Sequence, residues 1–231
     1  MPWVQDRSQE AAPGTPFEDR GTTIEPVVVA TPMGFMRSAP CTGMIVATGS
    51  GGVNGARRMD HESCVACDFD GSLFDARQLL DAIRALGPEW STLLSNAGDD
   101  LRVRPAPETW SAIEYAAHSR DITALHVFGV DQALRLDEPV IPEIAADELI
   151  EEASATYATA DPGLVASELG DQARLLADLA EAAGPASWTR GITIGDSRRD
   201  VRSLLEHALH DSHHHLVDVE DGLSVLRART R

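Results

Sequence analysis

Histidine is concentrated near the end of the chain, where five of the eight histidines fall within nine residues: His207, His210, His213, His214 and His215. Imidazole nitrogens are ligands of zinc and of other divalent metal ions. Two histidines at positions i and i+4 of a helix lie one turn apart on the same face, so both can reach one ion. His210 and His214 have this spacing, and we predict that they bind a metal ion together.

A third ligand is expected from another helix. His118 is the best candidate, because it lies on the same side of its expected helix as Trp110, whereas His126 lies off that stripe. The pair of His210 and His214 projects opposite to the leucine stripe of its own helix, so these two histidines do not simply face the core. Two plainer interpretations stay open: the histidine-rich segment is a solvated helix face, and His118 is a structural residue.

Charged side chains near these histidines have expected supporting roles. Asp121 and Asp211 each lie within one helical turn of an expected ligand, where a carboxylate could orient an imidazole by accepting its free N–H. Arg190 could bind a substrate carboxylate. The plainer alternatives are that Asp211 is solvated and that Arg190 pairs with an acid. No catalytic side chain is identified. The remaining histidines of the segment are interpreted first as solvated or structural: His207, His213 and His215. The alternative for His207 or His213 is a hydrogen bond that supports a metal ligand.

Residues 64–75, CVACDFDGSLFD, contain an acidic motif that is typical of haloacid-dehalogenase-type phosphohydrolases. In that class the first aspartate follows a buried hydrophobic strand, and a downstream basic residue, usually lysine, binds phosphate. The preceding residues, MDHESCVAC, do not form such a strand, and the chain contains no lysine. A phosphohydrolase is therefore a remote alternative, and Asp68 and Asp70 are predicted to belong to a cap before the first helix.

The same segment holds a C-x-x-C pair, Cys64 and Cys67, which allows three interpretations. The preferred one is that both cysteines pack an N-terminal cap onto the helices. A zinc site needs four ligands, and the pair supplies only two; His61 could be a third, but no second cysteine pair exists. A redox dithiol would be expected between a strand and a helix N-terminus.

Composition limits the class of partner. The formal net charge of the 231 residues is −18, and the first 58 residues hold five acids and five arginines, so the whole excess lies after residue 58. A domain with this excess of negative charge repels nucleic acid and anionic membranes. All 19 basic residues are arginine, a bias that high-GC coding produces, so an actinobacterial source is expected. Apolar runs are too short to span a bilayer, and we expect a cytoplasmic protein.

The chain is expected to contain one domain and a tail. Residues 1–58 are rich in Gly, Pro, Ser and Thr without helical or strand periodicity, which predicts a disordered tail. All five methionines lie at or before Met59, so we hypothesise that Met59 is the natural start and that the tail is mis-annotated. The domain then comprises residues 59–231.

Helical periodicity dominates that domain. Apolar stripes predict an all-α four-helix bundle, with a possible extended piece before the last helix. The expected helices are Leu73–Ala97 with an interruption near Gly87-Pro88, one from about Trp110 to before Pro139, Leu164–Ala183, and Asp200–Arg227.

Two sequence blocks carry a family resemblance. The block WSAIEYAAHSRD (Trp110–Asp121), together with HDSHHHLVDV (His210–Val219), resembles the DinB-like superfamily of metal-binding four-helix bundles. The resemblance extends over about residues 60–228. It is strongest to the actinobacterial branch, which includes mycothiol-dependent maleylpyruvate isomerase-like proteins and whose members often begin with C-x-x-C-x-F-D, here Cys64–Asp70.

The resemblance implies a bundle of up-down-down-up topology with one divalent ion, zinc or nickel, held by three histidines. Carried over to this chain, the ligands are His118, His210 and His214. The broader superfamily often continues its last block with R-G-Q, where this chain has residues 215–217, HLV. Members with known activity are thiol S-transferases or thiol-dependent isomerases that use mycothiol or bacillithiol.

These features together predict a metal-dependent low-molecular-weight-thiol S-transferase. A bound divalent ion favours the thiolate over the thiol, so a mycothiol-type cofactor would become nucleophilic without a protein cysteine. The expected partners are this small-molecule thiol and an electrophile, and a homodimer is a compatible assembly. The alternative function is a non-catalytic metal-binding or interaction module.

Overall fold

The computed structural model describes residues 61–142 and 155–229. The predictions for the tail, residues 1–58, and for a start at Met59 lie outside the described residues.

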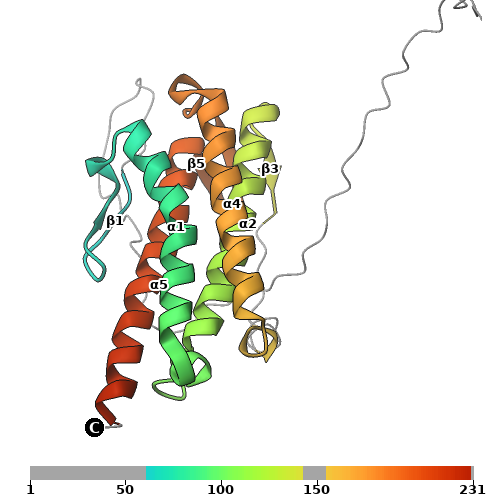
Figure 1. Cartoon of the computed structure of the whole chain (residues 1–231). Coiled ribbons are helices and arrows are strands. Elements are labelled where there is room, and N and C mark those ends of the chain that lie inside the picture. The colour runs from blue at the N-terminus through green and yellow to red at the C-terminus, as the bar shows by residue number, and fades with distance from the viewer. Residues whose placement is uncertain (1–60, 143–154, 230–231) are drawn as a thin grey trace, which may run out of the picture. The chain divides into compact units, whose positions relative to one another are not determined.

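Four long helices form the bundle in the described part of the chain, which confirms the all-α prediction (Figure 1). Helices α1 and α2 each pack against both α4 and α5, and they face each other across the bundle. Figure 1 shows α2 and α4 running in one direction and α1 and α5 in the other, which is the expected up-down-down-up topology. The helices are α1 (Ala76–Ala97), α2 (Ala112–Arg135), α4 (Pro162–Ala183) and α5 (Val201–Arg229).

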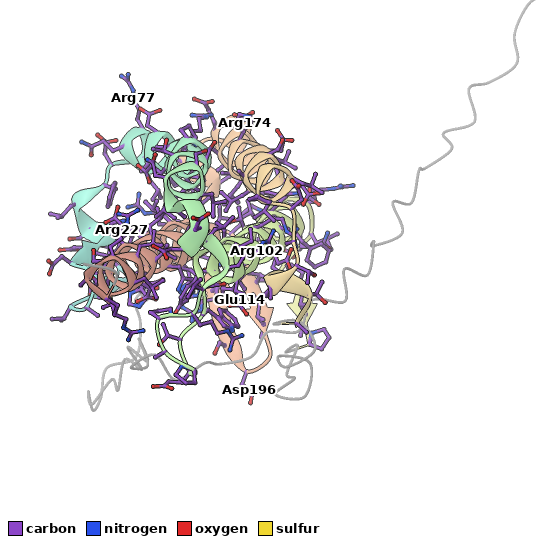
Figure 2. All side chains as sticks on the ribbon, turned by 60° about the horizontal axis from the view of Figure 1, so that its bottom comes forward. Arg77, Arg102, Glu114, Arg174, Asp196 and Arg227 are labelled. Atoms are coloured by element: carbon purple, nitrogen blue, oxygen red, sulfur yellow. The ribbon has the colours of Figure 1, made fainter. Side chains whose placement is uncertain are left out.

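Local sequence signals explain where two of these helices begin. The Asp75 carboxylate accepts the backbone N–H of Gln78, whose side chain in turn accepts the N–H of Asp75. Asp161 accepts the backbone N–H of Leu164 and precedes Pro162, a residue suited to the first turn. Charged side chains such as Arg77 and Arg174 point away from the bundle (Figure 2), and apolar side chains such as Trp90 fill its interior.

Helix α1 is continuous through Gly87 and Pro88, so the interruption expected there is wrong. The glycine has a packing role instead. A Cβ atom on Gly87 would lie 2.6 Å from the Cα of Gly170 in α4, closer than real Cβ contacts. The two glycines therefore allow α1 and α4 to approach each other closely.

Substituting Gly87→Ala is expected to destabilise the protein. The new methyl group meets backbone that cannot give way as a flexible side chain would, so the helices must move apart at a cost near the upper end of roughly 1–3 kcal/mol. This cost exceeds the gain of about 1 kcal/mol in helix propensity. Gly129→Ala is the matched control, because its Cβ would lie at an ordinary 3.5 Å from Leu204 Cδ1. Urea unfolding of both variants measures the difference, and equal stability would contradict the packing argument.

Short strands flank the bundle. Strands β1 (Ser63–Cys64) and β2 (Phe69–Asp70) form an antiparallel hairpin, with Cys64 opposite Phe69. The hairpin contacts α5 through β2. A second sheet has the order β3-β4-β5, which contains the expected extended piece, β4. Its strands are Val140–Ile141, Gly191–Ile194 and Ser197–Asp200, and three 3-10 helices complete the described elements: Gly71–Leu73, Gly98–Arg102 and Pro185–Ser187.

The acidic motif lies in this hairpin and not at the end of a buried parallel strand. Asp68 occupies the turn with φ of 57°. Asp70 caps the 3-10 helix Gly71–Leu73 by accepting the backbone and hydroxyl hydrogens of Ser72. Within residues 61–142 and 155–229 the only parallel pairing joins β3 to β4, so the architecture excludes a haloacid-dehalogenase core. The predicted cap before α1 is confirmed.

No helix in the described part of the chain is long and apolar enough to cross a membrane.

Candidate metal centres

Side chains that could hold a metal ion gather around α5. The described residues contain three such groups, and in each group the potential ligand atoms lie within 4.8 Å of one another. The first consists of His118, Asp211 and His215, and we call it the α2–α5 site. The second consists of Cys64, Cys67, His210 and His214, and we call it the hairpin site. The third consists of Glu62, His207 and His210.

The first two groups use two different faces of the same helix. Asp211 and His215 are one turn apart, as are His210 and His214, so each pair forms its own stripe along α5. Successive residues of a helix point about 100° apart. One stripe therefore faces α2, and the neighbouring stripe faces the β1–β2 hairpin.

The structure does not bring the three predicted histidine ligands together. His118 groups with Asp211 and His215, whereas His210 and His214 group with the two cysteines. The reason is the direction of the helix faces. His210 and His214 lie on the face of α5 that meets the β1–β2 hairpin, whereas only the face that carries Asp211 and His215 meets His118 on α2. Asp211, expected to orient a ligand, lies among the ligand atoms instead.

The α2–α5 site has a geometry that suits a divalent ion. The rings of His118 and His215 are 5.1 Å apart between centroids. The Nε2 atom of His215 lies 3.7 Å from Asp211 Oδ1. The second carboxylate oxygen, Asp211 Oδ2, is buried and has no hydrogen-bond partner among the described residues. A buried carboxylate oxygen without a partner is costly, and a cation between the two imidazoles would compensate it.

The protonation states of His118 and Asp211 also favour a cation at this site. Burial lowers the pKa of His118 to about 4, so its imidazole is neutral at neutral pH and retains a nitrogen lone pair. Burial opposes ionisation of Asp211, but the neighbouring histidines hold the pKa of its carboxyl below the ordinary value. A neutral imidazole and an ionised carboxylate are the states that a metal ion requires.

Asp218 fixes the orientation of His215, a role that the sequence interpretation missed. The Nδ1 atom of His215 donates to Asp218 Oδ2 at 3.1 Å, which leaves Nε2 directed toward Asp211. Metal-binding histidines commonly donate their other N–H to a carboxylate in this way. The i, i+3 spacing of the two residues on α5 was the available signal.

Aromatic rings surround the α2–α5 site. The ring of Trp110 lies 5.2 Å from that of His118, and the ring of Tyr115 lies 4.9 Å from that of His215. Tyr157 lies further out, with its centroid 6.5 Å from His118. These rings place apolar surface beside the two histidines of the site.

Asp121 supports this apolar surface. The Tyr157 hydroxyl donates to Asp121 Oδ2 at 2.9 Å, and Arg120 Nε donates to Oδ1 at 2.7 Å. The carboxylate therefore holds Tyr157 and Arg120, and its expected hydrogen bond from a ligand imidazole is not among its contacts.

Arg190 lies away from the histidines. Its guanidinium donates to the backbone carbonyls of Ala133 and Leu136, where it caps the C-terminal end of α2. Ala133 follows His118 by 15 residues of the same helix, a distance of roughly 22 Å along the axis. The structure thus gives Arg190 a structural position in place of the predicted substrate contact.

The hairpin site and the third group share His210. Glu62 Oε1 accepts the Nδ1 hydrogens of His207, at 2.8 Å, and of His210. Burial alone would raise the pKa of Glu62, yet these two hydrogen bonds lower it to about 2. Burial and the neighbouring Cys64 raise the pKa of Cys67 to about 11, the opposite of what a redox-active thiol needs.

Comparison with known proteins identifies the family. No curated protein matches the chain. A family model described as the DinB superfamily matches residues 82–218, more than half of the sequence. The chain belongs to the DinB superfamily. This DinB-superfamily match runs from within α1 to within α5 and so contains His118, Asp211 and His215.

A solved structure has the same fold. YfiT from Bacillus subtilis superposes on this DinB-superfamily protein with a TM-score of 0.58 at 15% sequence identity, covering 66% of this chain and 87% of its own. It is described as a probable metal-dependent hydrolase with an unusual four-helix bundle topology. At this identity the likeness shows the fold alone.

Proposed function

We propose that this protein is a metal-dependent enzyme whose divalent ion is held by His118, Asp211 and His215. One observation carries the proposal: the buried Asp211 Oδ2 has no hydrogen-bond partner in the described part of the chain and lies in a group with two imidazoles. The description of YfiT as metal-dependent supports it. Zinc or nickel suits a donor set of two imidazoles and one carboxylate.

The residues of the chain supply three functions at this site. His118, Asp211 and His215 would hold the ion and leave at least one coordination position open for a small molecule. Asp218 fixes the His215 ring, and the apolar surface of Trp110 reduces access of water. A divalent ion lowers the pKa of a thiol or a water molecule that it binds, which supplies a nucleophile at neutral pH.

The reaction that we propose is transfer of a low-molecular-weight thiol, of the mycothiol type, to an electrophile. In such a step the sulfur–carbon bond forms, the leaving group departs with its electron pair, and the thiol proton passes to solvent. The resemblance of the two histidine blocks to thiol-dependent members of the superfamily supports this choice. Hydrolysis is the second candidate, because the solved structure of the same fold is described as a hydrolase.

The test uses full-length protein that has been stripped with a chelator and reloaded with zinc. Mycothiol and chlorodinitrobenzene are supplied together, and both conjugate formation and chloride release are followed. We expect turnover by the zinc-loaded protein and background rates for the stripped protein.

Three other outcomes would change the conclusion. Cleavage of nitrophenyl acetate without any thiol would favour the hydrolase. Conjugation at an equal rate with and without zinc would contradict the proposed role of the ion. A bound ion without either activity would favour the non-catalytic metal-binding module.

A further inference from the structure

We propose a second metal site: the hairpin site, Cys64, Cys67, His210 and His214, binds a structural zinc ion that fastens the N-terminal hairpin to α5. The site is separate from the α2–α5 site, and the inference does not depend on the proposed enzymatic activity.

The four side chains form the donor set of a closed zinc site. Two thiols and two imidazoles are a common tetrahedral combination. Their potential ligand atoms lie within 4.8 Å of one another. Zinc–sulfur bonds of about 2.3 Å and zinc–nitrogen bonds of about 2.0–2.1 Å place tetrahedral ligand atoms about 3.3–3.8 Å apart. Cys64 Sγ and His214 Nδ1 are already 3.8 Å apart, so small side-chain adjustments complete the site.

His210 presents an unused nitrogen to this group. Its Nδ1 donates to Glu62 Oε1, which fixes the tautomer and leaves a lone pair on Nε2. The Nε2 atom is buried and lacks any hydrogen-bond partner within residues 61–142 and 155–229. His210 itself is only 5% exposed. The two neighbouring thiols can offer this nitrogen only a weak S–H donor, whereas a zinc ion would bind it together with both thiolates.

His214 is oriented in the same manner. Its Nδ1 faces Cys64, while its Nε2 lies 3.7 Å from Asp218 Oδ2. Asp218 also accepts the Nδ1 hydrogen of His215, so this carboxylate stands between the two metal groups. Each imidazole of the hairpin site therefore has a carboxylate beside the nitrogen that does not bind, as in other metal sites.

The hairpin is built to present its cysteines to α5. The chain reverses between Cys64 and Phe69, with Asp68 in a left-handed conformation. Phe69 stacks on the ring of His210 at 5.0 Å, and His213 Nε2 donates to the carbonyl of Cys67 at 3.3 Å. Cys64 and His214 are 150 residues apart in sequence, so an ion between them would join distant segments and stabilise only the folded chain.

His61, the third zinc ligand considered from the sequence, is used elsewhere. Its Nδ1 lies 2.7 Å from Glu206 Oε1. The hairpin site has four protein ligands and no open position, whereas the α2–α5 site has three. This difference assigns a structural role to the first and leaves chemistry to the second.

Cobalt substitution separates the two sites. Cobalt bound to thiolate sulfur has a charge-transfer absorption in the near ultraviolet, and the α2–α5 site contains no sulfur. We expect this absorption in full-length cobalt-loaded protein carrying Cys41→Ser, which removes the remaining cysteine. Adding Cys67→Ser removes one of the two thiolates and should markedly weaken the absorption, whereas Asp211→Asn should retain it at full strength. Absence of the absorption in the parent protein, or an undiminished absorption with Cys67→Ser, would overturn the proposal.

Thiol protection tests the same site without changing a ligand. In the zinc-loaded Cys41→Ser protein, Cys64 and Cys67 should resist alkylation by iodoacetamide, and a chelator should expose both. Mass spectrometry counts the modified thiols. Equal alkylation rates with and without the chelator, or a disulfide between the two cysteines, would contradict a zinc site.

Discussion

Substituting Asp211→Asn is expected to lower the affinity of the α2–α5 site for zinc by more than about 100-fold, because loss of even an outer partner of a metal ligand costs 10–100-fold. Asparagine has nearly the same shape but cannot supply the negative charge. One equivalent of zinc should disappear from the purified protein, and metal-dependent turnover should fall to background. Elemental analysis and the conjugation assay measure the two effects.

The stability of the same variant provides a second readout. In the presence of a chelator, Asp211→Asn removes a carboxylate whose pKa the neighbouring histidines lower, so the melting temperature of the metal-free variant should fall slightly. Added zinc should raise the melting temperature of the wild type more than that of the variant. Asp221→Asn on an exposed position of the same helix is the matched control and should behave as the wild type. Equal zinc-induced shifts in Asp211→Asn and wild type would contradict the site.

Substituting Arg104→Met is expected to cost roughly 3 kcal/mol in the free energy of unfolding, the lower end of the range for breaking a buried ion pair. Glu114 lies near the start of α2 (Figure 2). Its side chain is almost fully buried, and Arg104 and Ser111 donate hydrogen bonds to its carboxylate. Without the arginine, this buried carboxylate loses its ion pair. The lower end applies because Arg104 is about one-third exposed and water replaces part of the contact.

The pH dependence of this loss has a defined sign. Burial opposes ionisation of Glu114, but Arg104 and Ser111 lower the pKa of its carboxyl below the ordinary 4.5. The pair therefore stabilises the wild type above that pH, and the stabilisation is lost as the pH falls through the lowered pKa. The difference between Arg104→Met and wild type should shrink in acid.

Arg84→Met is the matched control for charge removal. Arg84 pairs with Asp178 and Glu181, which are both largely exposed. Exposed ion pairs contribute about 0–1 kcal/mol, so this variant should stay close to the wild type. Chemical denaturation of both arginine variants at neutral pH and in acid makes the comparison. Equal losses in the two variants would show that burial of Glu114 has no special cost.

The helices were predictable because their signals are local. Apolar periodicity and caps such as Asp75 act within a few residues, so the four helices and the all-α class follow from the sequence. The continuity of α1 through Gly87-Pro88 was not predicted, because the two residue types favour a break locally. The close approach of Gly87 to Gly170 is a contact between residues distant in the sequence, which local signals do not contain.

The candidate metal centres were only partly predictable. His118 and the histidine-rich helix were identified from the sequence. Two i, i+4 pairs on α5 could supply the other ligands, His210 with His214 and Asp211 with His215. The prediction chose the pair that consists only of histidines. The projection of His210 and His214 opposite to the leucine stripe already implied that they face away from α2. An aspartate is an equally suitable ligand, so Asp211 with His215 was the alternative to consider.

The cysteines show a different limit of sequence reasoning. The sequence contains no second cysteine pair that could complete a four-ligand zinc site with Cys64 and Cys67, so the zinc interpretation was not preferred. Their partners are histidines about 150 residues later, on a face of α5 that only the position of the β1–β2 hairpin makes relevant. Local motifs do not contain that information.

Anomalous diffraction at the zinc edge from crystals of the zinc-loaded protein is the most direct test of the α2–α5 site. We predict a peak at about 2.0–2.2 Å from one donor atom each of His118, Asp211 and His215. A peak that joins His118 to His210 and His214, or no peak between α2 and α5, would contradict this account.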